Sequence, residues 1–156
     1  MMELPKASQK VQEYLNQFGL NLQVKEFPAS TRTAQDAADA VGCELGQIIK
    51  SLVFRVHDKP LLFLVSGKNR LDVKKVRNDL SMPIQKADAQ FVRDATGYAI
   101  GGVPPVAHAA PIDVYIDKAL MDYKEVWAAA GTPHAVFQMS SRDLPRVTGG
   151  RVIAVV

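Results

Sequence analysis

Two consecutive apolar runs in the first half of the chain constrain its fold most. Residues 48–57 and 61–65 are rich in β-branched and aromatic residues, and the short segment 58–60, which contains Pro60, separates them. This pattern predicts two antiparallel strands joined as a hairpin.

The rest of the chain alternates between helical and strand patterns without a regular βαβ rhythm. The spacing of apolar residues predicts helices over residues 8–18, 34–41, 71–80 and 88–94, and a short one over 141–147 that Pro145 limits. Strand patterns occur at residues 22–27, 112–117, 126–130, 135–139 and 151–156. We therefore expect an α+β domain with a mixed, largely antiparallel β-sheet.

Length and composition narrow the class of protein. A chain of 156 residues suits one domain, so we treat residues 1–156 as a single one. One cysteine, Cys43, excludes an internal disulfide framework and a Cys-based zinc cluster. No run approaches about 18 apolar residues and no secretory signal pattern is visible, so we expect a cytoplasmic protein without a membrane span. A net charge of +3 permits contact with a polyanion without requiring it.

Lys50 is the unusual residue of the first predicted strand. Side chains alternate between the faces of a strand, so Lys50 shares a face with apolar residues such as Leu52 and Phe54. A lysine in that setting reaches solvent, pairs with an anion or lines a pocket, and partial burial would lower its pKa. Ser51 points to the opposite face, which makes a Ser/Lys nucleophilic pair geometrically poor.

The second unusual feature is the loop Gly101-Gly102-Val103-Pro104-Pro105. The glycines can take positive φ, whereas the prolines fix φ and have no N–H group. We therefore expect a stiff loop whose amide donors are those of Gly101, Gly102 and Val103. Fixed donors of this kind stabilise a developing oxyanion in acyl transfer. A rigid connection between two elements explains the same pattern.

The histidines and a basic stretch are weaker signals. His108 follows the glycine-proline loop, and His134 lies in the turn 131–134 between two predicted strands. Either could supply acid/base chemistry near neutral pH, but no third ligand stands at a familiar spacing, so we expect no metal. The basic stretch is a solvated helix face or a contact surface for RNA phosphates. Its members are Lys68, Arg70, Lys74, Lys75 and Arg77.

Taken together, these motifs resemble the YbaK/prolyl-tRNA editing family of aminoacyl-tRNA deacylases. The order and spacing of the motifs carry the resemblance, which runs through most of the chain. The matching segments are residues 30–34 (STRTA), 49–54 (IKSLVF), 65–67 (VSG), 71–76 (LDVKKV), 96–98 (TGY) and 101–105 (GGVPP).

The resemblance implies an α+β fold whose mixed sheet is flanked by helices, and hydrolysis of the ester that joins a wrong amino acid to the 3′ end of tRNA. It implies that Lys50 positions the tRNA terminus and that the loop, through Gly101 and Gly102, holds the aminoacyl group. A hydroxyl of the substrate's ribose helps to activate water in this family, so no protein nucleophile, metal or organic cofactor is implied. Substrate-binding roles are expected for Thr31, Ser66, Val103, Pro104, Pro105 and His134.

The turn at His134 bears on the choice of substrate. The cysteine-removing branch of the family carries a serine/glycine-rich turn and an aspartate here, whereas this chain resembles branches in which a histidine lines the amino-acid pocket. We therefore do not expect Cys-tRNA as the substrate, and alanyl-tRNA or another small mischarged amino acid is the hypothesis.

Other functions stay open at this point. One is a non-catalytic module that binds an aminoacyl-tRNA end, a nucleotide or a protein partner, and another is a Ser/Lys or histidine-dependent hydrolase of small esters. The sequence also leaves open the oligomeric state and whether an aminoacyl-tRNA synthetase is a partner.

Overall fold

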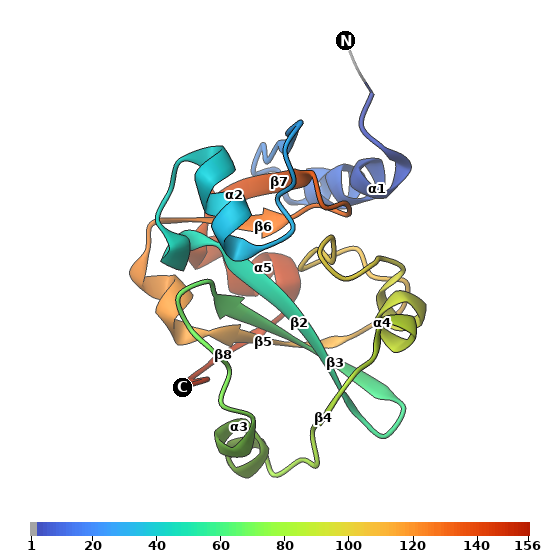
Figure 1. The fold of residues 1–156 in the computed structure, drawn as a ribbon, viewed down its shortest axis with the longest axis vertical. Coiled ribbons are helices and arrows are strands. Elements are labelled where there is room, and N and C mark those ends of the chain that lie inside the picture. Colours follow the sequence, from blue (N-terminus) through green and yellow to red (C-terminus); the bar gives the residue numbers. More distant parts are fainter. Residues whose placement is uncertain (1–2) are drawn as a thin grey trace.

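The computed structural model of the protein describes residues 3–156, whose strands form two β-sheets (Figure 1). The smaller sheet is antiparallel and has the strand order β1-β7-β6. Its strands are β1 (Val24–Glu26), β6 (Glu125–Ala129) and β7 (Ala135–Ser140).

The larger sheet has five strands in the order β4-β2-β3-β5-β8. Strand β2 pairs antiparallel with β3 and β4, whereas the β3–β5 and β5–β8 pairs are parallel. The expected α+β class with mixed, largely antiparallel pairing is confirmed, and the strands are divided between two sheets that a parallel bridge from Ile48 to Trp127 links. The five strands are β2 (Ile49–Val56), β3 (Lys59–Ser66), β4 (Gln85–Lys86), β5 (Asp113–Asp117) and β8 (Arg151–Ile153).

The predicted hairpin is present as β2 and β3, which pair from Val56 opposite Lys59 to Ile49 opposite Ser66. Its turn falls at His57 and Asp58 rather than at residues 58–60, and His57 has a φ of +53°. Pro60 therefore belongs to β3. The strand tolerates it because Pro60 precedes Leu61, where pairing with β5 begins.

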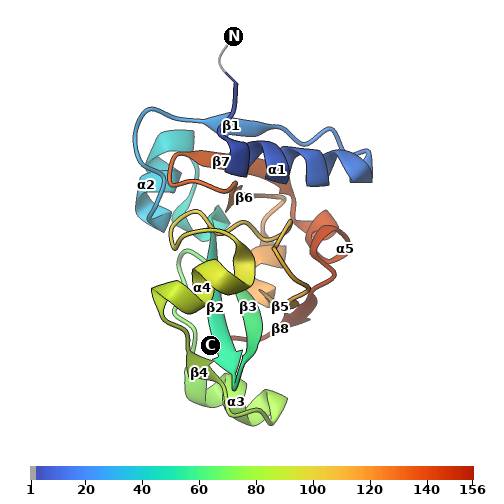
Figure 2. The ribbon, with the colours of Figure 1, turned by 90° about the vertical axis from the view of Figure 1, so that its right-hand side faces the viewer.

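The helices begin and end largely where the sequence predicts. Side chains at three N-caps, Thr33, Asp72 and Asp88, each accept a hydrogen bond from the backbone N–H three residues later. Figure 2 shows α1 along the smaller sheet, where the Ser8 hydroxyl donates to the Ala130 carbonyl at 2.7 Å. The helices are α1 (Lys6–Leu15), α2 (Ala34–Val41), α3 (Val73–Leu80), α4 (Ala89–Thr96) and α5 (Leu144–Thr148).

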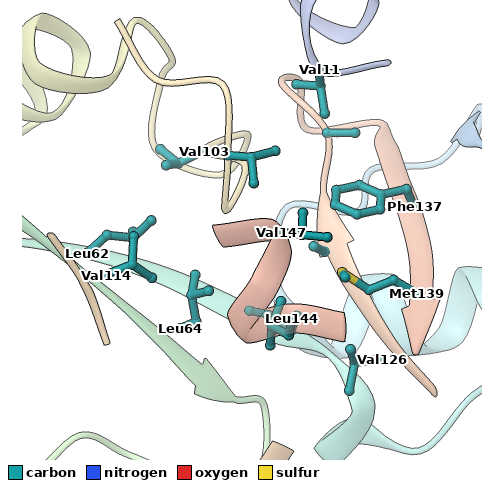
Figure 3. Packing of buried hydrophobic residues seen from close by; sticks show 14 of the residues in the cluster. Val11, Leu62, Leu64, Val103, Val114, Val126, Phe137, Met139, Leu144 and Val147 are labelled. Atoms are coloured by element: carbon teal, nitrogen blue, oxygen red, sulfur yellow. The ribbon is translucent and has the colours of Figure 1, made fainter. Parts of the chain in front are cut away.

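The main hydrophobic core fills the space between the two sheets, and the glycine-proline loop contributes to it. Figure 3 shows Val103 of the loop, Leu64 of β3 and Phe137 of β7 in the same cluster of buried side chains. A second cluster covers the opposite face of the larger sheet and contains Phe54, Phe63 and α3 residue Val76. The loop is therefore packed only on the face of the larger sheet that belongs to the main core. Among residues 3–156, no helix is long and apolar enough to cross a membrane.

The first prediction concerns this core. Phe137 is fully buried, whereas the Val152 side chain on β8 is 39 % exposed. We expect Phe137→Ala to lower the free energy of unfolding by about 3–5 kcal/mol, because it removes buried apolar surface and leaves a cavity. Val152→Ala, the control, should change it by less than about 0.5 kcal/mol. Urea unfolding followed by circular dichroism measures both, and a loss below about 1 kcal/mol for Phe137→Ala would contradict this packing.

Candidate functional site

A cavity of about 320 Å³ opens beside strand β2. On this side β2 pairs with β4 only at Phe54 and Arg55, so the preceding part of the strand, residues 50–53, has no strand beside it. Several of the predicted site residues border this open edge. The lining residues are Thr31, Arg32, Thr33, Ala34, Ile48, Ile49, Lys50, Ser51, Leu52, Ile100, Gly101, Val103 and Ala129.

The open edge explains how residues from opposite faces of β2 reach one cavity. Leu52 packs against the second cluster and Val53 against the main core, as strand alternation predicts. Lys50 therefore shares the face of Leu52, while Val103 of the loop belongs to the main core on the other face. A neighbouring strand would separate these two sides; without one, both border the same space.

Buried polar groups behind the cavity fix Lys50. Its Nζ donates to the Asn69 carbonyl oxygen. The Asn69 side chain donates to the Asp117 carboxylate at 2.9 Å, and the Ser66 N–H donates to the same oxygen at 3.0 Å. Burial lowers the pKa of Lys50 from its ordinary 10.5, Asp117 raises it and Arg70 lowers it. Lys50 is thus a half-buried cation in a defined position.

Ser66, one of the expected substrate-binding residues, lies one strand behind the cavity and is fully buried. Its hydroxyl donates to the Gly46 carbonyl at 2.7 Å. The next residue, Gly67, donates its N–H to the Ile48 carbonyl at 2.7 Å, and a Cβ at Gly67 would lie 2.4 Å from the Leu45 carbonyl oxygen. The observed bonds of Ser66 therefore hold the segment that leads to Asn69.

The glycine-proline loop presents two free amides rather than the expected three. Gly101 has a φ of +95°, which favours glycine, and it lines the cavity together with Val103. The Gly102 N–H donates to the Ala99 carbonyl at 3.0 Å, and the Gly102 carbonyl accepts from Gly131 at 2.9 Å. Gly102 is thus used to hold the loop. The N–H groups of Gly101 and Val103 make no hydrogen bond within residues 3–156.

The far side of the loop is held by side chains. His108 Nε2 lies 2.7 Å from the Pro104 carbonyl oxygen, and the Tyr98 hydroxyl donates to the Ala107 carbonyl at 2.9 Å. Burial lowers the pKa of His108 and raises the pKa of Tyr98 to about 12. Pro104 and Pro105 are buried, and neither lines the 320 Å³ cavity; Pro105 borders a separate cavity of about 600 Å³ next to α1.

Thr31 and Ser51 line the cavity and carry buried hydroxyls with no hydrogen-bond partner within residues 3–156. A buried hydroxyl without a partner costs free energy, so its retention indicates a place where a ligand or water completes the hydrogen bonding. The motif pointed to Thr31. From the sequence, Ser51 was set aside because its side chain points to the face of the strand opposite Lys50. No sequence signal showed that this part of β2 lacks a partner strand, which lets both residues line one cavity.

His134, expected to line the amino-acid pocket, is not among the residues that line the cavity. Its ring Nδ1 is 3.2 Å from the Ala29 carbonyl oxygen, and its carbonyl accepts a hydrogen bond from Phe27 at 2.8 Å. The preceding residue, Pro133, accepts a hydrogen bond from the Thr31 N–H at 2.6 Å. The turn that carries His134 is thus joined to the segment that carries Thr31.

The cavity lining contains two cations, Arg32 and Lys50, and no histidine, cysteine or carboxylate. Within residues 3–156, no group of three or more His, Cys, Asp or Glu side chains is arranged to hold a metal ion. The arrangement can therefore bind an anion or a polarised carbonyl, but it holds no base that would activate Ser51 or Thr31 as a nucleophile.

The chain is similar to several known proteins. A solved structure described as a candidate trans-editing enzyme for prolyl-tRNA synthetase superposes with a TM-score of 0.92, at 49 % identity over 98 % of both chains. The uncharacterized protein YwhH of Bacillus subtilis is 29 % identical over 91 % of both chains. The EbsC protein of Enterococcus faecalis, described as a candidate Cys-tRNA(Pro)/Cys-tRNA(Cys) deacylase, is 24 % identical over 76 % of this chain and 74 % of its own.

The family assignment covers the whole cavity and the elements around it. The sequence pattern of the aminoacyl-tRNA editing domain matches residues 28–147, a span that includes Thr31, Lys50, the glycine-proline loop and His134. The chain therefore belongs to the aminoacyl-tRNA editing domain family.

Proposed function

We propose that the protein is a trans-acting aminoacyl-tRNA deacylase that hydrolyses the ester bond of mischarged tRNA. The observation that carries the proposal is the β2-edge cavity, whose lining combines the fixed cation Lys50 with Gly101 and Val103, two loop residues whose N–H groups make no hydrogen bond within residues 3–156. The family and the trans-editing relative support the same reaction. Mischarged tRNA is then the substrate, and the cytoplasm is the compartment where it is met.

The site positions groups for attack by water. Water attacks the carbonyl carbon of the ester, the carbonyl oxygen gains negative charge, and the bond to the ribose oxygen breaks as that oxygen regains a proton. The N–H groups of Gly101 and Val103 are suited to stabilise the oxyanion, because they are fixed and make no other hydrogen bond. Lys50 holds the terminus of the tRNA. A ribose hydroxyl of the substrate assists the water, since the cavity lining holds no general base.

The substrate we propose is tRNA carrying a small amino acid such as alanine. A volume of about 320 Å³ leaves little space once the terminal ribose is bound. Thr31 is suited to a polar contact with the aminoacyl group because its hydroxyl has no partner. We assign Ser66, Gly102, Pro104 and Pro105 the role of holding the surrounding segments. The structural relative is described as acting for prolyl-tRNA synthetase, so we propose an aminoacyl-tRNA synthetase as a partner of this protein.

Replacement of Lys50 tests the reaction directly. We expect Lys50→Ala to reduce the rate constant for deacylation by roughly 100-fold, because it removes the fixed cation that orients the substrate. The assay measures release of amino acid from tRNAs mischarged with a panel of amino acids. Lys6→Ala, an exposed lysine at the start of α1, is the control and should retain activity. Binding of aminoacyl-tRNA without release of any amino acid would instead select the non-catalytic module.

The pH dependence follows from the burial of Lys50. Because burial lowers its pKa from 10.5, the ammonium loses its proton at a lower pH than an exposed lysine would. Enzymatic deacylation, corrected for spontaneous ester hydrolysis, should therefore decline with rising pH before pH 10.5. Lys50→Arg keeps its charge throughout this range, so its residual activity should show no such decline. Identical alkaline profiles for the two proteins would show that the charge of Lys50 does not limit the rate.

His134 tests the choice of amino acid. We expect His134→Ala to change the ratio of kcat/KM between alanyl-tRNA and a tRNA carrying a larger amino acid by about tenfold, because the turn that carries His134 is bonded to the segment of Thr31, which lines the cavity. The exposed His57 at the hairpin turn supplies the control, and His57→Ala should leave that ratio unchanged. Equal loss of kcat/KM for both substrates would assign His134 to the stability of the turn instead.

A further inference from the structure

A second cavity, of about 600 Å³, lies between α1 and the segment that follows the glycine-proline loop (Figure 1). We call it the α1 cavity. None of the residues that line it also lines the β2-edge cavity. Its volume suits a small organic molecule, and the deacylation chemistry proposed above uses none of its polar groups.

The inner wall of the α1 cavity is apolar. Val106 and Val114 are buried residues of the main core, and both line the cavity. Ile112 packs against the same core and also lines the cavity. A ligand that covers this wall removes apolar surface from water, so an apolar group on the ligand stabilises binding.

Two opposite charges on α1 border the same cavity. Lys10 and Glu13 are three residues apart on the helix, a spacing at which opposite charges usually attract each other. Within residues 3–156 neither residue forms an ion pair. The Lys10 ammonium lies 5.3 Å from the centre of the Tyr98 ring, in a cation–π contact. The α1 cavity is therefore bordered by a cation and an anion that do not neutralise each other.

His108 adds a hydrogen-bond acceptor. Its Nε2 is 2.7 Å from the Pro104 carbonyl oxygen, and because a carbonyl only accepts, Nε2 carries the proton. Burial lowers the pKa of His108 below its ordinary 6.5, against the opposing effect of the bond to Pro104, and the charge of Lys10 lowers it further. The ring is therefore neutral at pH 7, and Nδ1 keeps a lone pair that has no partner within residues 3–156. Since His108 lines the cavity, Nδ1 can accept from an N–H of a ligand.

The backbone around His108 is held in place. Ala107 has a φ of +64°, a left-handed conformation that costs a residue other than glycine about 1 kcal/mol. The Tyr98 hydroxyl donates to the Ala107 carbonyl at 2.9 Å. These contacts fix the imidazole at the wall of the cavity.

The chemistry of these groups identifies the ligand. A free α-amino acid carries an ammonium and a carboxylate on one carbon, so it can bridge a cation and an anion that are neighbours without touching. Its carboxylate suits Lys10, its ammonium suits Glu13 and Nδ1 of His108, and an apolar side chain suits the inner wall. In aminoacyl-tRNA the carboxylate is consumed by the ester. The α1 cavity therefore matches a free amino acid and not its ester.

We propose that the α1 cavity is a second ligand site, which binds a free α-amino acid with an apolar side chain. The proposal goes beyond the proposed function, because the ligand is not the tRNA ester and the site is not the β2-edge cavity. His108 also holds Pro104, the residue after Val103. The bound amino acid therefore contacts the support of the glycine-proline loop.

The test compares L-leucine with three analogues that each lack one feature. 4-Methylpentanoate lacks the ammonium, 3-methylbutylamine lacks the carboxylate, and L-asparagine has a polar side chain of similar size. Titrations followed by ¹H–¹⁵N NMR should give each analogue a dissociation constant about tenfold above that of leucine, as expected for loss of a charge-assisted hydrogen bond or of the apolar contact. The amide signals that shift should include those of residues 106–110.

Variants assign the contacts to residues. Lys10→Met should weaken leucine binding about tenfold without weakening that of 3-methylbutylamine, which has no carboxylate. Glu13→Gln should weaken leucine binding about tenfold without weakening that of 4-methylpentanoate, which has no ammonium. Lys6→Ala, on the same helix but outside the cavity lining, is the matched control and should retain leucine binding. Lys50→Ala should also retain it, because Lys50 lines only the β2-edge cavity.

The outcomes separate this proposal from the proposed function. The α1 site is overturned if leucine shows no saturable binding, if the four compounds bind equally, or if Lys50→Ala abolishes leucine binding while Lys10→Met retains it. Weaker binding of every compound in both α1 variants would contradict the assigned charge contacts. None of these results depends on release of amino acid from tRNA, so the deacylation panel decides the proposed function separately.

Discussion

The pairing of β2 with β3 is the interaction on which the site depends. Eight residue pairs hold β2 on one side, from Ile49 opposite Ser66 to Val56 opposite Lys59. On the other side β4 contributes only two pairs, at the end of β2 close to the turn. The strand is therefore rigid because of β3 and open because β4 is short. An open edge of a sheet normally invites aggregation. Here the glycine-proline loop and residues 31–34, which lead into α2, lie across the cavity from this edge.

Buried polar contacts also fix the position of the residues that line the cavity. Asp117, almost fully buried at the end of β5, accepts hydrogen bonds from Ser66, Asn69 and Ala119. Because Asn69 supplies the carbonyl that binds Lys50, the position of this lysine depends on a carboxylate two strands away. Hydrogen bonds of Gly102 and a contact between His108 and the Pro104 carbonyl hold the backbone of the loop. Gly101 and Val103 line the cavity. Both Lys50 and the loop are thus held in place by hydrogen bonds within the protein itself.

Local patterns predicted most of the elements and part of the site. The spacing of apolar residues placed the starts of the helices that Thr33, Asp72 and Asp88 cap within one or two residues of the observed ones. The hairpin turn was misplaced by about one residue because Pro60 suggested a turn, whereas His57 adopts the left-handed backbone that the turn needs. Strand β4, two residues long, carries no periodic signal and was missed. Its shortness is the reason the site exists.

The sequence by itself determined the family, the α+β class and the two unusual segments, Lys50 on an apolar strand face and the glycine-proline loop. It could do so because strand alternation and the restricted φ of glycine and proline are local properties. The division of the strands into two sheets and the open edge of β2 were decided only in the tertiary structure. So were the capture of the Gly102 amide by Ala99, the buried hydroxyls of Thr31 and Ser51, and Arg32 lying across Gly101. These features arise between segments far apart in the chain, where no local pattern records which groups meet.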